Sequence, residues 1–146
     1  MFKKHIFHYS MVTLFSLFVL TSCAGLADYD IDLPGDYSVV RTSAHKIFIS
    51  PEIGDNNWGP EVIPSEVTEV TWDDNYILVK QLVLMNDPNS SNGYQIPNED
   101  DEHFWIINYK NGDIFGPLNE EHFVEKKNEL GILESVILKK IEDLKN

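Results

Sequence analysis

The sequence predicts an α+β fold: an antiparallel sheet of about six strands in three hairpins, with one or two C-terminal helices packed on one face. Three observations predict this class. Short segments of alternating or continuous apolar residues are separated by turn residues, a pattern typical of strands. The pair Asn111-Gly112 supplies the positive φ angles that a tight hairpin turn requires. After Asn119, apolar residues recur at helical spacing.

The three hairpins are predicted from pairs of segments joined by short turns. In the second hairpin, residues 76–84 form the most apolar segment of the domain, so we expect this strand at the centre of the sheet. The paired segments are residues 37–42 with 45–50, 67–72 with 76–84, and 104–109 with 114–117.

Two hydrophilic stretches are predicted to be loops. Residues 52–60 have no periodicity and contain Trp58, while residues 86–102 form a long segment rich in Asn, Ser and acidic residues. Trp72 and Trp105 fall within predicted strands, and we expect both in the core. Trp58 is therefore the tryptophan that we expect at an exposed contact.

The C-terminal third predicts two helices. Asn119 is a good N-cap, and Glu120 and Glu121 follow it in the first turn, where the helix dipole favours acidic side chains. Gly131 stands where a helix commonly ends. A second amphipathic helix is predicted beyond it from the spacing of Ile132, Leu133, Val136, Ile137, Ile141 and Leu144.

The N-terminus has the organisation of an export signal. Lys3 and Lys4 precede an uncharged apolar run over residues 11–20, which is shorter than the roughly 20 residues needed to cross a bilayer. We therefore expect a signal helix rather than a permanent span. The residues that follow, Leu20-Thr21-Ser22-Cys23, resemble the lipobox of bacterial lipoproteins cut by the type II signal peptidase.

The lipobox resemblance implies cleavage between Ser22 and Cys23. It also implies an S-diacylglyceryl group on the Cys23 thiol, and it allows an additional N-acyl chain. The chain would then divide into a cleaved signal peptide over residues 1–22, a lipidated N-terminus and tether over 23–34, and one globular domain over 35–146. The mature protein would be anchored to the lipid bilayer of the cell membrane by acyl chains, facing outside the cytoplasm.

Two segments of the body carry a second resemblance. The run from Phe104 to Leu130, and especially its part from Asn111 through Gly116-Pro117-Leu118 to Glu121, is similar to small uncharacterised bacterial lipoproteins of the family called domain of unknown function 3997. The segment Asp36-Tyr37-Ser38-Val39-Val40-Arg41 is similar to the same family. The resemblance implies kinship. It implies no activity, because that family has none to transfer.

The mature domain is strongly acidic. All 24 acidic residues lie at or beyond Asp28, and loss of Lys3 and Lys4 leaves nine basic residues, a formal charge of −15. Such a charge repels nucleic acid and anionic headgroups, so we expect no nucleic acid partner and no bilayer contact by the folded body. Cys23 is the single cysteine, which excludes an internal disulfide and a cysteine-based metal site.

No residue set indicates catalysis, a cofactor or a metal. His45, His103 and His122 have no ligand spacing, and residues 99–102 are interpreted as solvated acid rather than as a cation site. The chain contains no Gly-x-Ser-x-Gly and no Ser-x-x-Lys motif, so we predict that it is not an enzyme.

The predicted function is a non-enzymatic module that binds a protein or another envelope component. Residues 52–60, with Trp58, and residues 86–102 are the predicted contact segments. One alternative is an immunity or inhibitor protein against a basic toxin or hydrolase, which the acidic charge would favour. A second alternative is an envelope hydrolase, which requires a pocket with converging polar side chains. The oligomeric state is not predicted.

Overall fold

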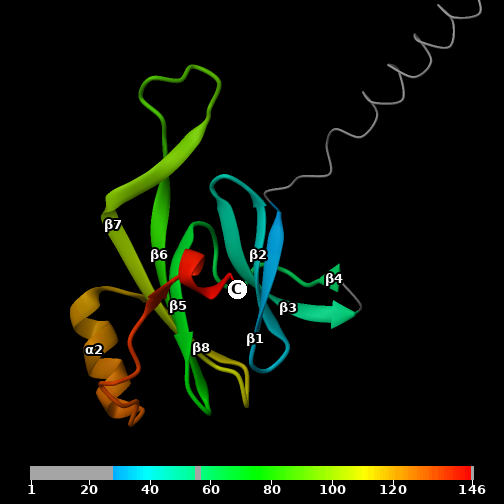
Figure 1. Cartoon of the computed structure of the whole chain (residues 1–146). Coiled ribbons are helices and arrows are strands. Elements are labelled where there is room, and N and C mark those ends of the chain that lie inside the picture. Colours follow the sequence, from blue (N-terminus) through cyan, green and yellow to red (C-terminus); the bar gives the residue numbers. More distant parts are fainter. Residues whose placement is uncertain (1–27, 55–56, 146) are drawn as a thin grey trace, which may run out of the picture.

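Two antiparallel sheets form most of the computed structural model, which describes residues 28–54 and 57–145 (Figure 1). The predicted signal peptide, the cleavage position at Ser22 and the lipidation position at Cys23 lie outside the described residues. The described part of the chain contains nine strands, one α-helix and a short 3-10 helix, so the protein is mostly β. Among the described residues, no helix is long and apolar enough to cross a membrane.

The first sheet has the order β1-β2-β3-β4. Its strands are β1 (Tyr29–Leu33), β2 (Tyr37–Ser43), β3 (Lys46–Gly54) and β4 (Asn57–Trp58). The predicted hairpin of residues 37–42 and 45–50 is confirmed as β2 and β3. Residues 29–33, which the sequence assigns to the tether, pair with β2 along their whole length, so regular structure begins before residue 35.

The second sheet has the order β8-β7-β6-β5-β9. Its strands are β5 (Val67–Trp72), β6 (Tyr76–Asn86), β7 (Gln95–Asn108), β8 (Asp113–Leu118) and β9 (Lys139–Lys140). The two other predicted hairpins are confirmed as β5–β6 and β7–β8, and Gly112 has φ +83° in the second turn. β6 lies at the centre of the sheet, as its continuous apolar sequence predicts.

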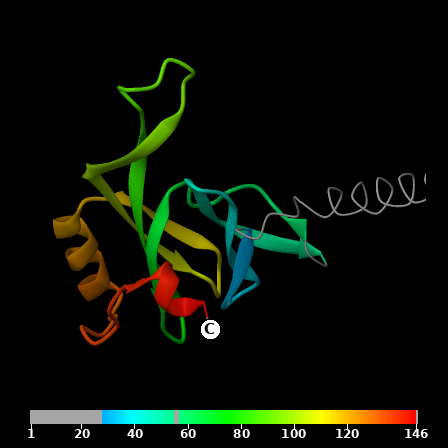
Figure 2. The same ribbon diagram turned by 45° about the horizontal axis from the view of Figure 1, so that its top comes forward.

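Alternate residues of β6 and β7 are buried on opposite faces of the second sheet, which explains their continuous apolar sequence. Ile77, Val79 and Ile107 face the first sheet and pack in one core cluster with residues such as Val39 and Ile49. On the other face, a second cluster joins the central strands to the helix; its buried members are Leu78, Phe104, Ile106, Phe123 and Ile132. The layers are therefore sheet, sheet and helix (Figures 1 and 2).

Helix α2 (Glu120–Glu129) confirms the predicted cap and the predicted covering of one sheet face. The Asn119 side chain accepts a hydrogen bond from the His122 N–H at 2.9 Å, which satisfies one free donor of the first turn. Phe123 stacks on Phe104 of β7 with ring centroids 4.9 Å apart. Gly131 follows the helix with φ +70°.

The predicted second C-terminal helix is wrong. Lys139–Lys140 instead pair with Glu69 and Val70 as β9, and residues Ile141–Leu144 form the 3-10 helix η1. Of the apolar residues at helical spacing, Ile132 and Ile141 are buried, whereas Leu133 and Ile137 are 70% and 67% exposed. The prediction of a single sheet of about six strands is also wrong, because the strands divide between two sheets.

The predicted loop over residues 86–102 is confirmed only for residues 87–94, because Asn86 ends β6 and residues 95–102 belong to β7. β6 and β7 stay paired from Val83↔Asn98 to Asn86↔Gln95, beyond a bulge that follows Leu82↔Glu102. We call residues 83–98 the arm. The arm projects beyond the rest of the second sheet (Figures 1 and 2). Its polar sequence reflects this position, because neither face of a projecting hairpin needs a continuous apolar row.

A candidate binding pocket beside the arm

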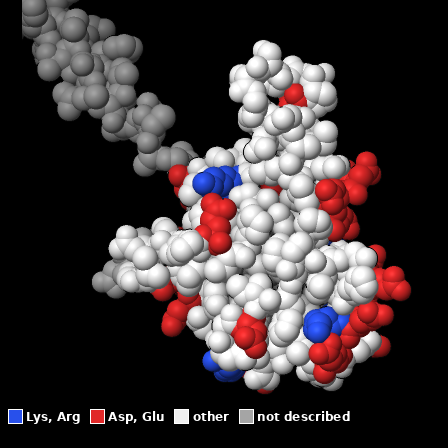
Figure 3. Space-filling view, turned by 180° about the vertical axis from the view of Figure 1, so that it is seen from behind, with Lys and Arg blue, Asp and Glu red and all other residues white. Residues whose placement is uncertain are grey.

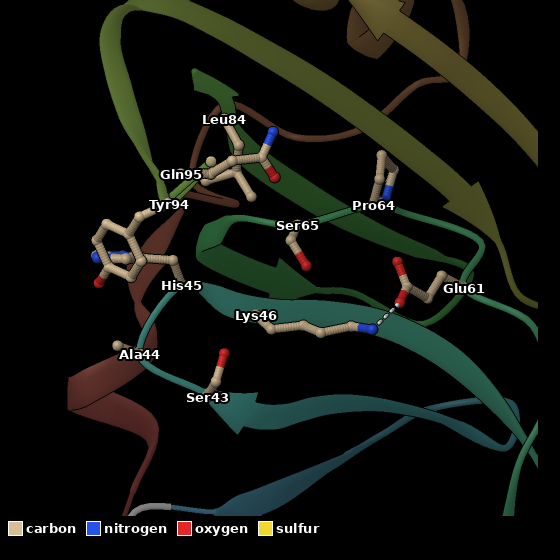
Figure 4. Close-up of a pocket in the computed structure, with 11 residues that line it drawn as sticks. Ser43, Ala44, His45, Lys46, Glu61, Pro64, Ser65, Leu84, Tyr94 and Gln95 are labelled. Atoms are coloured by element: carbon tan, nitrogen blue, oxygen red, sulfur yellow. Dashed lines mark ion pairs between the residues drawn. The ribbon is translucent and has the colours of Figure 1, made fainter. Parts of the chain in front are cut away.

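A pocket of about 580 Å³ lies between the arm and the body of the protein. Three segments line it: residues 43–46 at the β2–β3 turn, Glu61, Pro64 and Ser65 before β5, and Leu84, Gly93, Tyr94 and Gln95 of the arm. Figure 4 shows these side chains around the opening, with Tyr94 and His45 together at one end. The pocket therefore joins parts of both sheets to the projecting hairpin.

Charged groups around the pocket occur in close pairs. The Lys46 ammonium lies 3.3 Å from a Glu61 carboxylate oxygen (Figure 4). His45 Nδ1 is hydrogen-bonded at 2.9 Å to Oε2 of Glu66, whose side chain is only 12% exposed. A buried carboxylate needs such a partner, because removing it from water without one is costly.

Tyr94 brings the arm into contact with the body. Its ring meets the His45 ring edge to face, with centroids 5.9 Å apart, although Tyr94 remains 48% exposed. On the pocket wall, the Ser65 hydroxyl is buried and has no hydrogen-bond partner in the described structure. A buried hydroxyl normally has one. Ser65 Oγ is therefore a buried polar atom on the pocket wall whose hydrogen-bonding capacity is unused in the described structure.

A hydrogen-bonded chain supports the wall behind Ser65. The Gln81 side chain, 4% exposed, donates from Nε2 to the Ser65 carbonyl oxygen at 2.9 Å. Its Oε1 accepts from the Trp105 indole N–H at 2.8 Å. The backbones of Glu66 and Leu82 exchange two further hydrogen bonds, at 3.0 and 2.9 Å. These contacts fix the segment before β5 against β6 at the base of the arm.

The arm is almost free of charge in a chain whose residues are 24% charged. Asp87 is the one charged residue between Gln81 and Asn98. Figure 3 shows the arm as a white projection with a red spot near its tip, above a surface with many red groups. Met85 and Tyr94 are exposed on it by 41% and 48%. Residues 99–102 then place four acidic side chains at the base of the arm.

The predicted contact residue Trp58 lies elsewhere. It pairs with Glu52 in the β3–β4 hairpin, is half-buried, and does not line the pocket. Ile53 of the same hairpin is 70% exposed. The two segments predicted to bind therefore form two separate hairpins. Of the tryptophans expected in the core, Trp105 packs against it, but Trp72 is 39% exposed and that prediction is wrong.

The residues that form the pocket were not predicted from the sequence as a site. His45, Ser65 and Tyr94 are far apart in the chain, and no spacing rule connects them. One feature of the sequence could have indicated the pocket, because Tyr94 is the single aromatic residue in the polar stretch 86–102.

The three histidines also remain separate, with His45 beside Glu66 and His103 3.5 Å from Asp101. In residues 28–54 and 57–145, no group of three or more His, Cys, Asp or Glu side chains could hold a metal ion.

The described part of the chain is a small, mostly β domain with two antiparallel sheets, one covering helix and a projecting hairpin. Residues 34–142 match the model of the family described as Protein of unknown function (DUF3997), and the chain belongs to this family. The match spans β2 to β9 and the helix but not β1, so the resemblance seen in two segments extends over most of the domain. No curated protein and no solved structure matches the chain.

Proposed function

We propose that the protein is a lipid-anchored lipoprotein outside the cytoplasm whose domain is a non-enzymatic module that binds a protein of the cell envelope. The observation that carries the binding role is the arm. It is a projecting hairpin with exposed Met85 and Tyr94 and a single charge, on an otherwise acidic protein. Protein interfaces are depleted of charge at their centre and enriched in aromatic residues and methionine.

The anchor in this proposal rests on the sequence around Cys23. One acyl chain gives only marginal membrane attachment, whereas two chains bury enough methylene groups to hold a protein stably, at about 0.8 kcal/mol for each group. Five residues separate Cys23 from the start of β1 at Tyr29. At no more than about 3.6 Å per residue, this stretch would keep the domain within about 20 Å of the bilayer.

The geometry of the anchored domain favours a partner near the membrane. β1 begins at the end of the molecule from which the arm also projects (Figure 1). A chain held through Cys23 would therefore present the arm on the side of the anchor. The acidic surface would be repelled by anionic headgroups, which favours a protein over lipid as the partner of the arm.

The anchor is tested by the mass of the mature N-terminus and by cell fractionation. The expected result is an N-terminal Cys23 carrying a diacylglyceryl group, with the protein in the membrane fraction. Cys23→Ala should abolish both the lipid and membrane retention, and Ser10→Ala, a change far from the cleavage position, should alter neither. A soluble, unmodified wild-type protein would contradict the anchor.

The binding role is tested by cross-linking in intact cells and purification of the full chain in mild detergent. We expect one envelope protein to be retained by the wild type and lost with Met85→Ser combined with Tyr94→Ala. Val124→Ser, which changes another exposed apolar side chain on α2, is the matched control and should retain it. Equal retention by all three proteins would refute the arm as the contact. A retained basic toxin or hydrolase would select the inhibitor alternative.

A hydrolase is the second candidate function, favoured by the hydrogen bond between His45 and Glu66 beside the buried Ser65 hydroxyl. A carboxylate that orients a histidine is the supporting half of a nucleophilic triad. No hydrogen bond in the described structure joins His45 to Ser65. Hydrolysis of ester or amide probes by the wild type, lost with Ser65→Ala and with His45→Ala, would establish this candidate, and inactivity of the wild type would exclude it for those substrates.

A further inference from the structure

The strand β6 has a free edge that begins where β5 leaves it. The last contacts between the two are the reciprocal backbone hydrogen bonds of Glu66 and Leu82. Before Glu66 the chain turns away through Ser65 and Pro64, and both residues line the pocket. Beyond Leu82, no strand in the described part of the chain pairs with this edge of β6.

The backbone groups on this edge follow from the alternation of an antiparallel pair. The N–H and C=O of Leu82 point toward Glu66, so those of Leu84 and Asn86 point to the same side. The backbone groups of the intervening residues point the opposite way, toward the other strand of the arm. The Asp87 N–H shows this independently, because it donates to the Tyr94 carbonyl oxygen at 2.8 Å across the arm. Pro97, which has no N–H, stands opposite Leu84, at a position that needs no bond to β6.

The free edge opens into the pocket. Leu84 lines the pocket, as do Pro64 and Ser65, which lie where a continuation of β5 would depart from β6. At the pocket, Leu84 thus provides one outward backbone donor and acceptor, Leu84 and Tyr94 provide apolar surface, and the Ser65 hydroxyl has no partner among the described residues. The next outward backbone groups, those of Asn86, lie on the same edge just beyond the lining. This is the combination that binds an extended polypeptide by strand addition, where the backbone gives affinity and pockets accept alternate side chains.

We propose that an extended segment of a basic partner protein binds in this pocket and adds a short strand to the free edge of β6 at Leu84 and Asn86. The inference rests on the proposed binding function and names the mode and the partner's chemistry. A basic segment is favoured by the formal charge of −15 on the mature chain. The positive charge of Lys46 does not oppose binding of a basic segment, because Lys46 is already paired with Glu61.

Amide hydrogen exchange at single-residue resolution tests the mode directly. The probe is a synthetic peptide of alternating valine and threonine with two lysines at each end, added to the full chain in mild detergent. Strand addition should slow exchange at Leu84 and Asn86 by about tenfold or more at saturation, because a newly formed hydrogen bond protects each amide. Val83 and Met85 already bond to β7 and should change little.

Variants separate backbone pairing from side-chain contact. Leu84→Pro removes the outward N–H and should weaken peptide binding about tenfold, the value of roughly one hydrogen bond. Leu84→Ala keeps that N–H and should weaken binding less. Val124→Ala changes an exposed apolar side chain on α2 that does not line the pocket, so it is the control and should leave binding unchanged. Unaltered protection at Val83 and Met85 in the proline variant shows that the arm is intact.

A peptide flanked by glutamates instead of lysines should bind more weakly, and added salt should reduce this difference. Binding of the lysine peptide without protection at Leu84 and Asn86, or equal loss with proline and alanine, would overturn strand addition. So would the absence of peptide binding. These failures are distinct from failure of the proposed function, because an envelope partner could still be retained through Met85 and Tyr94 in the cross-linking experiment.

Discussion

Gln81 is the residue whose replacement tests the arrangement at the base of the arm most directly. Its side chain is 4% exposed and makes two hydrogen bonds, one to the Ser65 carbonyl oxygen and one from the Trp105 indole. In Gln81→Leu, the leucine has a similar volume, but it cannot hydrogen-bond to the Ser65 carbonyl oxygen or to the Trp105 indole N–H. Each of the two groups left without a partner costs about 1–3 kcal/mol, so we expect the free energy of unfolding to fall by at least about 2 kcal/mol.

Urea unfolding followed by far-ultraviolet circular dichroism measures this loss, using the chain from Leu26 onward so that β1 is retained. Gln95→Leu is the matched control, because Gln95 is exposed on the arm and its replacement should change the free energy of unfolding by less than about 0.5 kcal/mol. A domain of this size unfolds with about 5–15 kcal/mol, so the Gln81 variant should remain folded and measurable.

A double-mutant cycle with Trp105→Phe isolates the indole bond. Phenylalanine removes the N–H that Gln81→Leu leaves without a partner, so the double variant should be more stable than the sum of the single losses predicts. We expect a coupling of about 0.5–3 kcal/mol. Additive losses, or a cost of less than about 1 kcal/mol for Gln81→Leu, would refute the assignment of Gln81 as the support of the pocket wall.

Two further predictions concern Gly116 and Asn119. Gly116 has φ +148°, and a Cβ there would meet the Trp105 ring and lie 3.0 Å from the Phe104 carbonyl oxygen. Gly116→Ala should therefore lower the free energy of unfolding by about 2–4 kcal/mol. Gly112→Ala should cost only about 1 kcal/mol, because Gly112 has a positive φ but open space around it; equal costs would contradict the close approach. Asn119→Ala should cost about 1 kcal/mol by removing the cap of α2, and Asn119→Asp should restore most of it, both measured by the same urea assay; a neutral alanine variant would show that the cap contributes nothing.

The successes of sequence analysis depend on interactions between near neighbours. The turn at Gly112 requires a positive φ angle, and the cap of Asn119 contacts an N–H three residues away. Each can be predicted without knowing the rest of the fold. β6 was placed at the sheet centre for a similar reason, because a strand that is apolar on both faces needs cover on both.

The failures occur where tertiary contacts override a local pattern. The apolar spacing after Gly131 suits a helix, but pairing of Lys139 and Lys140 with β5 holds this segment in another conformation, with Ile141 buried against the first core cluster. In the arm, tertiary pairing instead adds regular structure that the local sequence does not predict. Residues 95–98 look like loop, yet they remain β because their backbone is paired with β6.

The sequence by itself determined the short-range features of this protein: three hairpins, the capped helix, the acidic charge and the expectation of an anchor at Cys23. Only the tertiary structure decided that the strands form two sheets, that β6 has a free edge, and that His45, Ser65 and Tyr94 meet beside it. The physical reason is how far apart in the sequence the interacting residues lie. Turns and caps depend on backbone angles within a few residues, whereas a sheet edge and a pocket depend on which distant strands pair and where that pairing stops.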